Sequence, residues 1–238
     1  MRAFCLSLTY GLCLLPVAGR AFTLTPMSAT LAPKGNGTVQ TFRIENESSN
    51  RVAFEVKLLT RQMDEAGNET NQPAANLFTV FPPQGVIAPG KSQSLRLVWQ
   101  GPANPTNELA FRLVAEELPV NFTAEKNRAQ IKVVLRYMAA VYVQPRNAKP
   151  NLQVASFTRS ATNTYHLILT NSGNAHQPLI DPTLTLTDAQ GRRREVLADA
   201  LVPVAGQNVL AGHTRRFVLT LPAEFQDASY QAQLTTHE

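Results

Sequence analysis

Cysteine is almost absent from this sequence, which holds two cysteines among 238 residues. Both of them, Cys5 and Cys13, lie in the first apolar stretch of the chain. The rest of the chain therefore cannot form a disulfide, and it offers no thiolate to bind a metal or attack a substrate. Its stability must come from buried apolar side chains and from hydrogen bonds.

Charged and aromatic residues are scarce as well. Asp, Glu, Lys and Arg make up 16% of the residues and aromatic side chains 7%, whereas hydrophobic residues reach 44%. This composition excludes a disordered chain, because disordered chains are rich in charge and poor in apolar side chains. The formal net charge is +5, from 22 basic and 17 acidic residues. So mild a charge gives no support for nucleic-acid binding.

The sequence also lacks a recognisable catalytic or metal-binding motif. Its four histidines are scattered without an HExxH pair, and neither GxSxG nor a phosphate-binding loop occurs. Asp64 and Glu65 could bind a metal together with Glu69, but a solvated loop accounts for all three. The arginine run at 192–194 follows a turn and is interpreted as solvated charge. We therefore predict no catalytic residue, no metal, no cofactor and no enzyme activity.

The N-terminus has the pattern of a secretory signal. Arg2 supplies a positive end, Phe4 to Val17 is short and mostly apolar, and small residues follow. This run is shorter than the roughly 20 apolar residues that span a membrane, and no later segment is longer. We predict a signal peptide over residues 1–21 and an exported protein. Cleavage after Gly19 and cleavage after Ala21 both fit.

One stretch, Gln130 to Val143 (QIKVVLRYMAAVYV), alternates for far longer than an ordinary strand. Its fourteen residues would extend about 46 Å, whereas a typical strand extends about 17–20 Å. A helix is excluded because apolar residues fall at every second position. Every odd position is apolar: Ile131, Val133, Leu135, Tyr137, Ala139, Val141 and Val143.

Two explanations fit the part of this strand that exceeds one domain. It is either a hairpin arm covered by the same chain, or a strand kept exposed for insertion into the sheet of another protein.

The remaining sequence alternates strand-like runs with turn signals, which is typical of an all-β protein. Asp64 to Ala75 is predicted to be a long polar loop, and PRNAKP (145–150) a short linker. We predict two β-sandwich domains in tandem, over residues 22–144 and 151–238. Strands are expected at 22–26, 38–46, 51–59, 94–99 and 108–119, with five or six more after the linker.

Three segments together carry a family resemblance: FPPQGVIAPGKSQSLRLVW, ELAFRLVAEELPV and IKVVLRYMAAVYVQP. Their order resembles the periplasmic pilus chaperones of the chaperone–usher pathway. The resemblance implies two immunoglobulin-like domains, a periplasmic location, no cofactor and no catalysis. It also implies that the long strand is lent to a pilin (fimbrial) subunit, which is then delivered to an outer-membrane usher. The inserted side chains would be Ile131, Val133 and Leu135, and Tyr137 would belong to the same subunit-binding strand.

The sequence departs from this family at the basic pair that grips a subunit's terminal carboxylate. Ser28 and Ala140 stand at the two positions of that pair. This places the chain nearer the divergent, archaic branch. Arg112 and Arg136 are candidates for a replacement charge anchor, and a plain surface role is the alternative for each.

A second departure concerns the contact between the domains. Glu108 matches a family acidic residue at this contact, but Gln144 stands at the position of its basic partner. The ionic link between the domains is therefore in doubt.

The alternative function from a different class is a secreted carbohydrate-binding or adhesive β-sandwich. Such modules expose aromatic side chains, whereas Trp99, the single tryptophan, lies in an apolar strand. Self-association of the free chain through its exposed strand is a further expectation.

Overall fold

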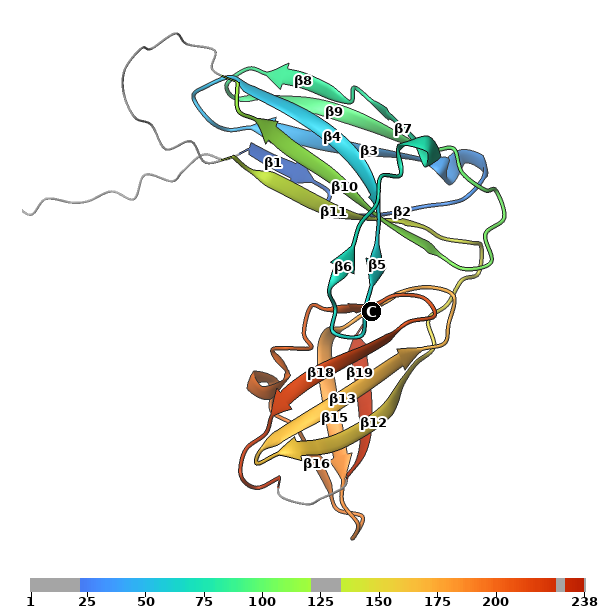
Figure 1. Ribbon diagram of the computed structural model, residues 1–238, viewed down its shortest axis with the longest axis vertical. Coiled ribbons are helices and arrows are strands. Elements are labelled where there is room, and N and C mark those ends of the chain that lie inside the picture. Colours follow the sequence, from blue (N-terminus) through green and yellow to red (C-terminus); the bar gives the residue numbers. More distant parts are fainter. Residues whose placement is uncertain (1–21, 121–133, 226–229, 238) are drawn as a thin grey trace, which may run out of the picture.

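The computed structural model of the chain describes residues 22–120, 134–225 and 230–237. These residues form two β-sandwich domains arranged end to end (Figure 1). Within these ranges, helical structure is limited to three short 3-10 turns: η1 (Gly35–Thr38), η2 (Ala75–Leu77) and η3 (Ala198–Leu201). No helix in the described ranges is long and apolar enough to cross a membrane. The predicted fold class, two immunoglobulin-like β-sandwiches in tandem, is confirmed.

The first domain consists of two facing sheets. One has the order β1-β3-β9-β7, with strands β1 (Phe22–Thr25), β3 (Val39–Asn46), β9 (Lys91–Trp99) and β7 (Phe78–Phe81). The other has the order β2-β11-β10-β4-β8, with strands β2 (Ser28–Leu31), β11 (Arg136–Val143), β10 (Leu109–Leu118), β4 (Val52–Thr60) and β8 (Gln84–Ile87). The pairing of β2 with β11 is parallel, and the other pairings are antiparallel.

The second domain is built in the same way from shorter sheets. One sheet contains β12 (Leu152–Ala161), β13 (Thr164–Asn171) and β18 (Thr214–Thr220). The other contains β16 (Arg193–Glu195), β15 (Ile180–Thr187) and β19 (Gln231–His237). A two-stranded piece joins β14 (Gln177–Pro178) to β17 (Asn208–Val209).

Each domain has its own hydrophobic core. In β4 the alternating residues Val52, Phe54, Val56 and Leu58 are buried in the first core. In β13 the alternating residues Leu167 and Leu169 are fully buried in the second. Alternation therefore selects the buried face of these strands, as side chains of period two require.

A small hairpin occupies part of the segment that we predicted to be a loop. It pairs β5 (Gln62–Met63) with β6 (Glu69–Thr70) and points from the first domain toward the second (Figure 1). Its turn is closed by the Asp64 carboxylate, which accepts bonds of 2.8 Å from the backbone and side-chain nitrogens of Asn68. Gly67 adopts a φ of 91°, which favours glycine. The polar composition therefore reflects turn chemistry rather than an irregular loop.

The long strand is shorter in the structure than in the prediction. Strand β11 begins at Arg136, and residues 134 and 135 lie outside it. The ladder with β10 likewise ends at the pair Glu116–Arg136, and one further backbone bond joins Glu117 to Leu135. Residues 130–133, including Ile131 and Val133, lie outside the described residues.

Candidate functional site

Strand β11 has one edge that is only half covered. The Ala140 N–H donates to the carbonyl of Met27 at 2.9 Å, and the Gln144 N–H to that of Leu31 at 2.9 Å. Alternate residues of a strand direct their backbone groups to the same side. Met138 and Arg136 therefore face the same side, but β2 begins at Ser28 and pairs only with Ala140 to Val143. In the described structure this part of the edge has no neighbouring strand, which leaves it open to pairing.

The opposite edge of β11 is covered by β10 along the whole strand. The pairing runs from Leu109–Val143 to Glu116–Arg136, and the Glu117 N–H donates to the Leu135 carbonyl at 2.9 Å. The open edge therefore belongs to a strand that is already extended and held from one side.

The core-facing side chains of β11 change gradually in burial. Ala139, Val141 and Val143 are fully buried, whereas Leu135 and Tyr137 are partly buried against the same core. The ring of Tyr137 lies 5.8 Å from that of Phe22. Of the four residues predicted for the subunit-binding strand, the structure thus places Leu135 and Tyr137 at the margin of the first core, and the other two lie outside the described residues.

Arg112 reaches this open edge from the neighbouring strand. It stands opposite Ala140 in the β10–β11 ladder. Its Nη1 donates to the carbonyl of Met138 at 3.4 Å, which is a long hydrogen bond. A lysine at position 140 would compete for this space, whereas alanine leaves it to the arginine. The second candidate, Arg136, is exposed and stands opposite Glu116, away from this group.

Glu69 of the hairpin holds Arg112 in place. The Arg112 Nε and Nη2 donate to the two Glu69 oxygens at 2.9 Å and 2.5 Å. Arg61 Nε donates to the same carboxylate at 2.8 Å. Burial raises the pKa of Glu69, but hydrogen bonds from Arg112 and the charges of both arginines outweigh burial and hold the pKa below its ordinary value. Two guanidinium groups share one carboxylate, so the cluster keeps a net positive charge.

The sequence alone did not identify Arg61, and it led us to interpret Glu69 as part of a solvated loop. The Arg61 side chain is 6% exposed, and its Nη1 donates to the Tyr142 hydroxyl at 2.7 Å. Glu69 is an ion-pair partner rather than a ligand shared with Asp64 and Glu65, and among the described residues no three metal-binding side chains gather. The cluster joins Arg61, between β4 and β5, to residues from β6, β10 and β11, and no local spacing in the sequence indicates it.

Tyr142 connects this cluster to the second domain. Its hydroxyl accepts from Arg61 and from Asn208 Nδ2, the latter at 2.8 Å. Burial is the main reason that the pKa of Tyr142 lies above its ordinary value, so the phenol stays neutral. Around it, a small apolar cluster spans both domains: Ala140, Tyr142, Leu210, Met63 and Ala110.

Glu108 does contact the second domain, but through a different partner, His176. The Glu108 side chain is 1% exposed, and its two oxygens lie 2.8 Å and 2.9 Å from Nδ1 of His176. Gln144 Nε2 donates to the same carboxylate at 3.0 Å. The imidazole also stacks on the Tyr142 ring at 3.7 Å. His176 comes from the second domain, 68 residues along the chain, so the sequence alone gives no signal for this pair.

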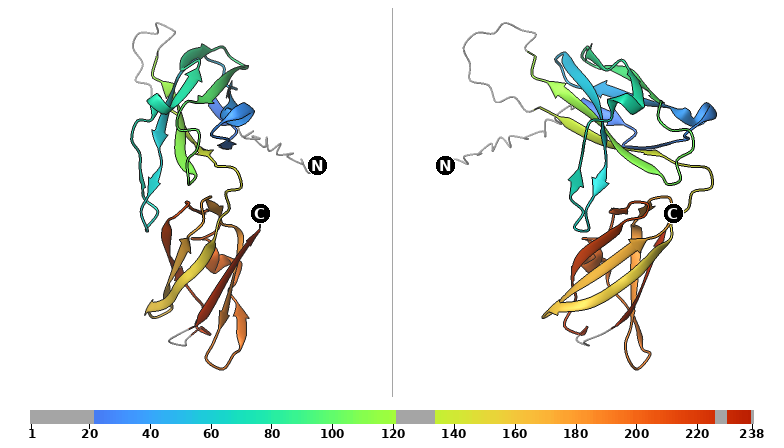
Figure 2. Two further views of the ribbon diagram at one scale, coloured as in Figure 1. Left: turned by 90° about the vertical axis from the view of Figure 1, so that its right-hand side faces the viewer. Right: turned by 45° about the vertical axis from the view of Figure 1, so that its right-hand side comes forward.

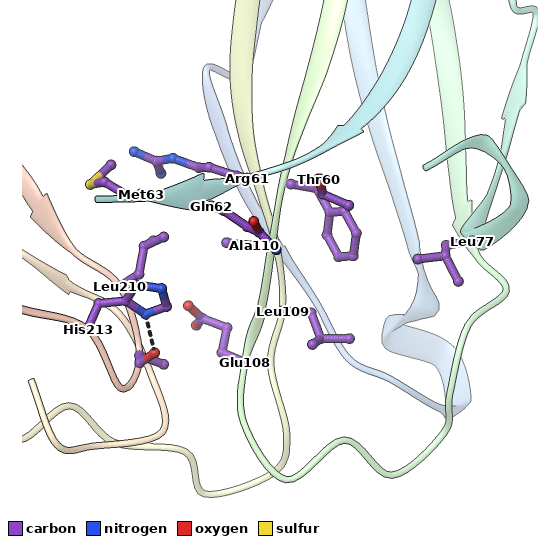
Figure 3. A pocket seen from close by; sticks show the side chains of 12 residues that line it. Thr60, Arg61, Gln62, Met63, Leu77, Glu108, Leu109, Ala110, Leu210 and His213 are labelled. Carbon is purple, nitrogen blue, oxygen red and sulfur yellow. Dashed lines mark hydrogen bonds between the residues drawn. The ribbon is translucent and has the colours of Figure 1, made fainter. Parts of the chain in front are cut away.

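A groove of about 490 Å³ lies where these contacts meet (Figure 3). The first domain contributes Arg61 and Met63 beside the end of β10, and the second domain contributes Leu210 and His213. The His213 Nδ1 is 2.8 Å from the Ala211 carbonyl. The site is therefore an open edge of β11 beside a positively charged cluster, with a groove at the junction of the domains.

The chain is similar to known chaperones of pilus assembly. Residues 24–149 match the family of pili and flagellar-assembly chaperones, PapD N-terminal domain. No curated protein sequence matches the chain.

Solved structures show the same fold at low sequence identity. The class 5 fimbriae chaperone CfaA is 17% identical, with a TM-score of 0.56, over 92% of this chain and 100% of that one. The SafB chaperone, solved with the Salmonella enterica pilin SafA, is 15% identical, with a TM-score of 0.56, over 85% of each chain. The complex CsuC–CsuE from archaic pili of Acinetobacter baumannii matches at 16% identity and a TM-score of 0.51, over 83% of this chain and 89% of that one.

Proposed function

This chain belongs to the periplasmic pilus-assembly chaperones of the chaperone–usher pathway, and we propose that it holds pilus subunits at the open edge of β11. Its partners are pilin subunits and the outer-membrane usher that receives them. One observation carries the proposal: β11 is extended and paired with β10, yet Met138 and Arg136 face no neighbouring strand in the described structure. A subunit that lacks a strand would pair there.

Strand addition explains both affinity and register. Backbone hydrogen bonds along the edge bind any extended partner, and side chains that enter pockets fix its position. We assign the inserted side chains to Ile131, Val133 and Leu135. Tyr137 follows them, and its contact with Phe22 marks the place where the strand passes from the subunit into the chaperone's own core. The SafB chaperone, which shares this fold, was solved in complex with a pilin, and this supports a pilin as the partner.

Arg112 is the better candidate for the charge anchor. Its Nη1 lies against the Met138 carbonyl at the open edge, whereas Arg136 stands apart from the charged cluster. The cluster of Arg61, Arg112 and Glu69 bears a net positive charge, which favours a carboxylate of the subunit. We propose that it replaces the missing basic pair and that the chain belongs to the archaic branch.

Further assignments follow from the proposal. We infer a signal peptide over residues 1–21, domains over 22–144 and 151–238, and a linker over 145–150. The chain acts by binding and not by catalysis. Without a subunit, the same open edge offers a place for a second copy of the chain to pair.

The test is the triple variant Ile131→Thr, Val133→Thr, Leu135→Thr. Each inserted side chain contributes roughly 1.5–3 kcal/mol when a partner buries it, so the loss is on the order of 5–9 kcal/mol. A micromolar complex is worth about 8 kcal/mol, so co-purification with a subunit should be abolished. The melting temperature of the free protein should fall only modestly, by the contribution of Leu135, which is partly buried against the first core. Retained co-purification, or collapse of the free fold, contradicts strand donation.

A further inference from the structure

The β5–β6 hairpin touches the second domain at its tip (Figure 2). The Arg216 N–H, at the beginning of β18, donates to the Glu65 carbonyl at 2.7 Å. Arg215 Nη1 lies 3.0 Å from the sulfur of Met63. The backbone of Gly67 lies so close to Arg215 that a Cβ there would come within 2.7 Å of Cζ. The tip therefore fits closely onto two consecutive residues of β18.

The residue at this contact, Arg215, is a buried arginine without an ion pair among the described residues. It is 5% exposed, it stacks over Phe217 at 4.9 Å, and its Nη1 donates to the Asn208 carbonyl at 2.9 Å. No ion pair to Arg215 occurs within the described ranges, and its Nε lacks a hydrogen-bond partner there. Burial and then the charge of Arg61 lower its pKa, while Asp64 and Glu69 oppose this. Its Nη2 also donates to the Gln207 side-chain oxygen at 3.4 Å. A buried charge without an ion-pair partner adds little stability.

The base of the hairpin is fastened to the first domain. Glu69 binds Arg112 of β10, and Arg61 at the start of the hairpin binds Glu69 and Tyr142. The hairpin is thus fixed at both ends, once in each domain.

A separate attachment holds the linker side of the junction. The Glu108 N–H donates to the Asn174 carbonyl at 3.0 Å, and the Lys149 N–H to the Asn174 side chain at 2.9 Å. An attachment at the linker alone would leave the domains free to swing about it. Tyr142 and Glu108 add contacts with Asn208 and His176 of the second domain. The hairpin supplies a further attachment on β18, and each added attachment restricts the swing of one domain about the linker.

We propose that the β5–β6 hairpin is a strut that fixes the angle between the two domains, with Gly67 and Arg215 as its positioning residues. The strut keeps the second domain beside the cluster that holds Arg112. The role of that cluster in subunit binding rests on the proposed function, but the strut itself is defined in the free chaperone.

The test measures the distance between the domains without a subunit. A chain that begins at Phe22 contains no cysteine, so spin labels can be placed at Gln100→Cys and Thr158→Cys, two exposed positions. Gly67→Ala should shift and broaden the distance distribution, because the added methyl displaces the Arg215 guanidinium. Gly35→Ala is the matched control: Gly35 has a φ of 78°, but nothing lies within 4 Å of an added Cβ. It should suffer similar backbone strain and keep the distribution of the parent protein.

A second variant tests the same contact in case Gly67→Ala does not fold. Arg215→Met keeps an unbranched side chain but removes the guanidinium that the hairpin tip covers, and it should broaden the distribution as Gly67→Ala does. Narrow, unshifted distributions in both folded variants would overturn the strut. Because no subunit is present, this result is independent of whether the triple threonine variant loses its subunit.

Discussion

Replacing Glu69 by glutamine tests the charged cluster most directly. The change keeps the size of the side chain but removes the negative charge that Arg61 and Arg112 share. Two guanidinium groups would then face each other without a carboxylate between them. We expect the first domain to lose stability, because Arg61 is 6% exposed and cannot turn to water without breaking its bond to Tyr142.

The expected size of the loss follows from burial. Removing one partner of a fully buried pair costs about 3–5 kcal/mol, whereas an exposed pair contributes about 0–1 kcal/mol. The side chains of Arg112 and Glu69 are 18% and 19% exposed, which lies much nearer the buried limit. Glutamine also retains one acceptor oxygen. We therefore expect a loss of about 2–3 kcal/mol at pH 7, measured by urea unfolding.

The loss should depend on pH in one direction. The pKa of Glu69 is lowered in the folded state, so its contribution is fully present above the unfolded pKa of about 4.3. It disappears as the pH falls through the folded pKa, since the protonated carboxyl resembles glutamine. The stability difference between the parent protein and Glu69→Gln should therefore shrink as the pH is lowered from 7 into the acid range.

The control is Glu47→Gln, a change at an exposed glutamate. It should cost no more than about 0.5 kcal/mol at any pH. If Glu69→Gln behaves like this control, or if its effect is the same at all pH values, the cluster does not stabilise the domain in the way described.

Two further predictions concern the same region. Tyr142→Phe removes the hydroxyl that accepts from Arg61 and should cost about 1–3 kcal/mol, measured as a fall in the free energy of unfolding; an unchanged value would mean that solvent replaces the bond. Arg112→Gln should weaken subunit binding in a titration at low salt, whereas Arg136→Gln should leave it nearly unchanged. Equal effects of the two changes would remove the reason for preferring Arg112.

Local patterns were sufficient to predict several strands of the first domain. In β4, apolar residues recur at every second position from Val52 to Leu58 and are buried, although Ala53 is buried as well. An apolar face of this kind strongly favours one register. Strand β10 was recognised for the same reason. In β11 the sequence pattern continues beyond the strand that the described residues form, because apolar alternation records what a strand can bury and not how far its neighbours extend.

The contacts of Glu69 and Glu108 were beyond prediction because their partners are distant in the chain. Glu69 lies 43 residues from Arg112, and Glu108 lies 68 residues from His176. Each residue is ordinary in its own segment. Glu69 was interpreted within a polar loop, where a hairpin turn and a solvated loop have the same composition. Only the packing of the second domain against the first brings His176 to a buried glutamate.

The one-sided pairing of β11 also lowers the entropic cost of adding a subunit strand. Fixing the backbone of a residue costs about 1–2 kcal/mol, and an ordinary strand association imposes this on both strands. Residues Arg136 to Met138 are already extended along β10, so an arriving segment must order only itself there. Over these three residues the saving is on the order of 3–6 kcal/mol. The chaperone thus presents a strand that is already ordered on one side. A subunit strand can begin to pair with it beside β2 and continue toward Arg136.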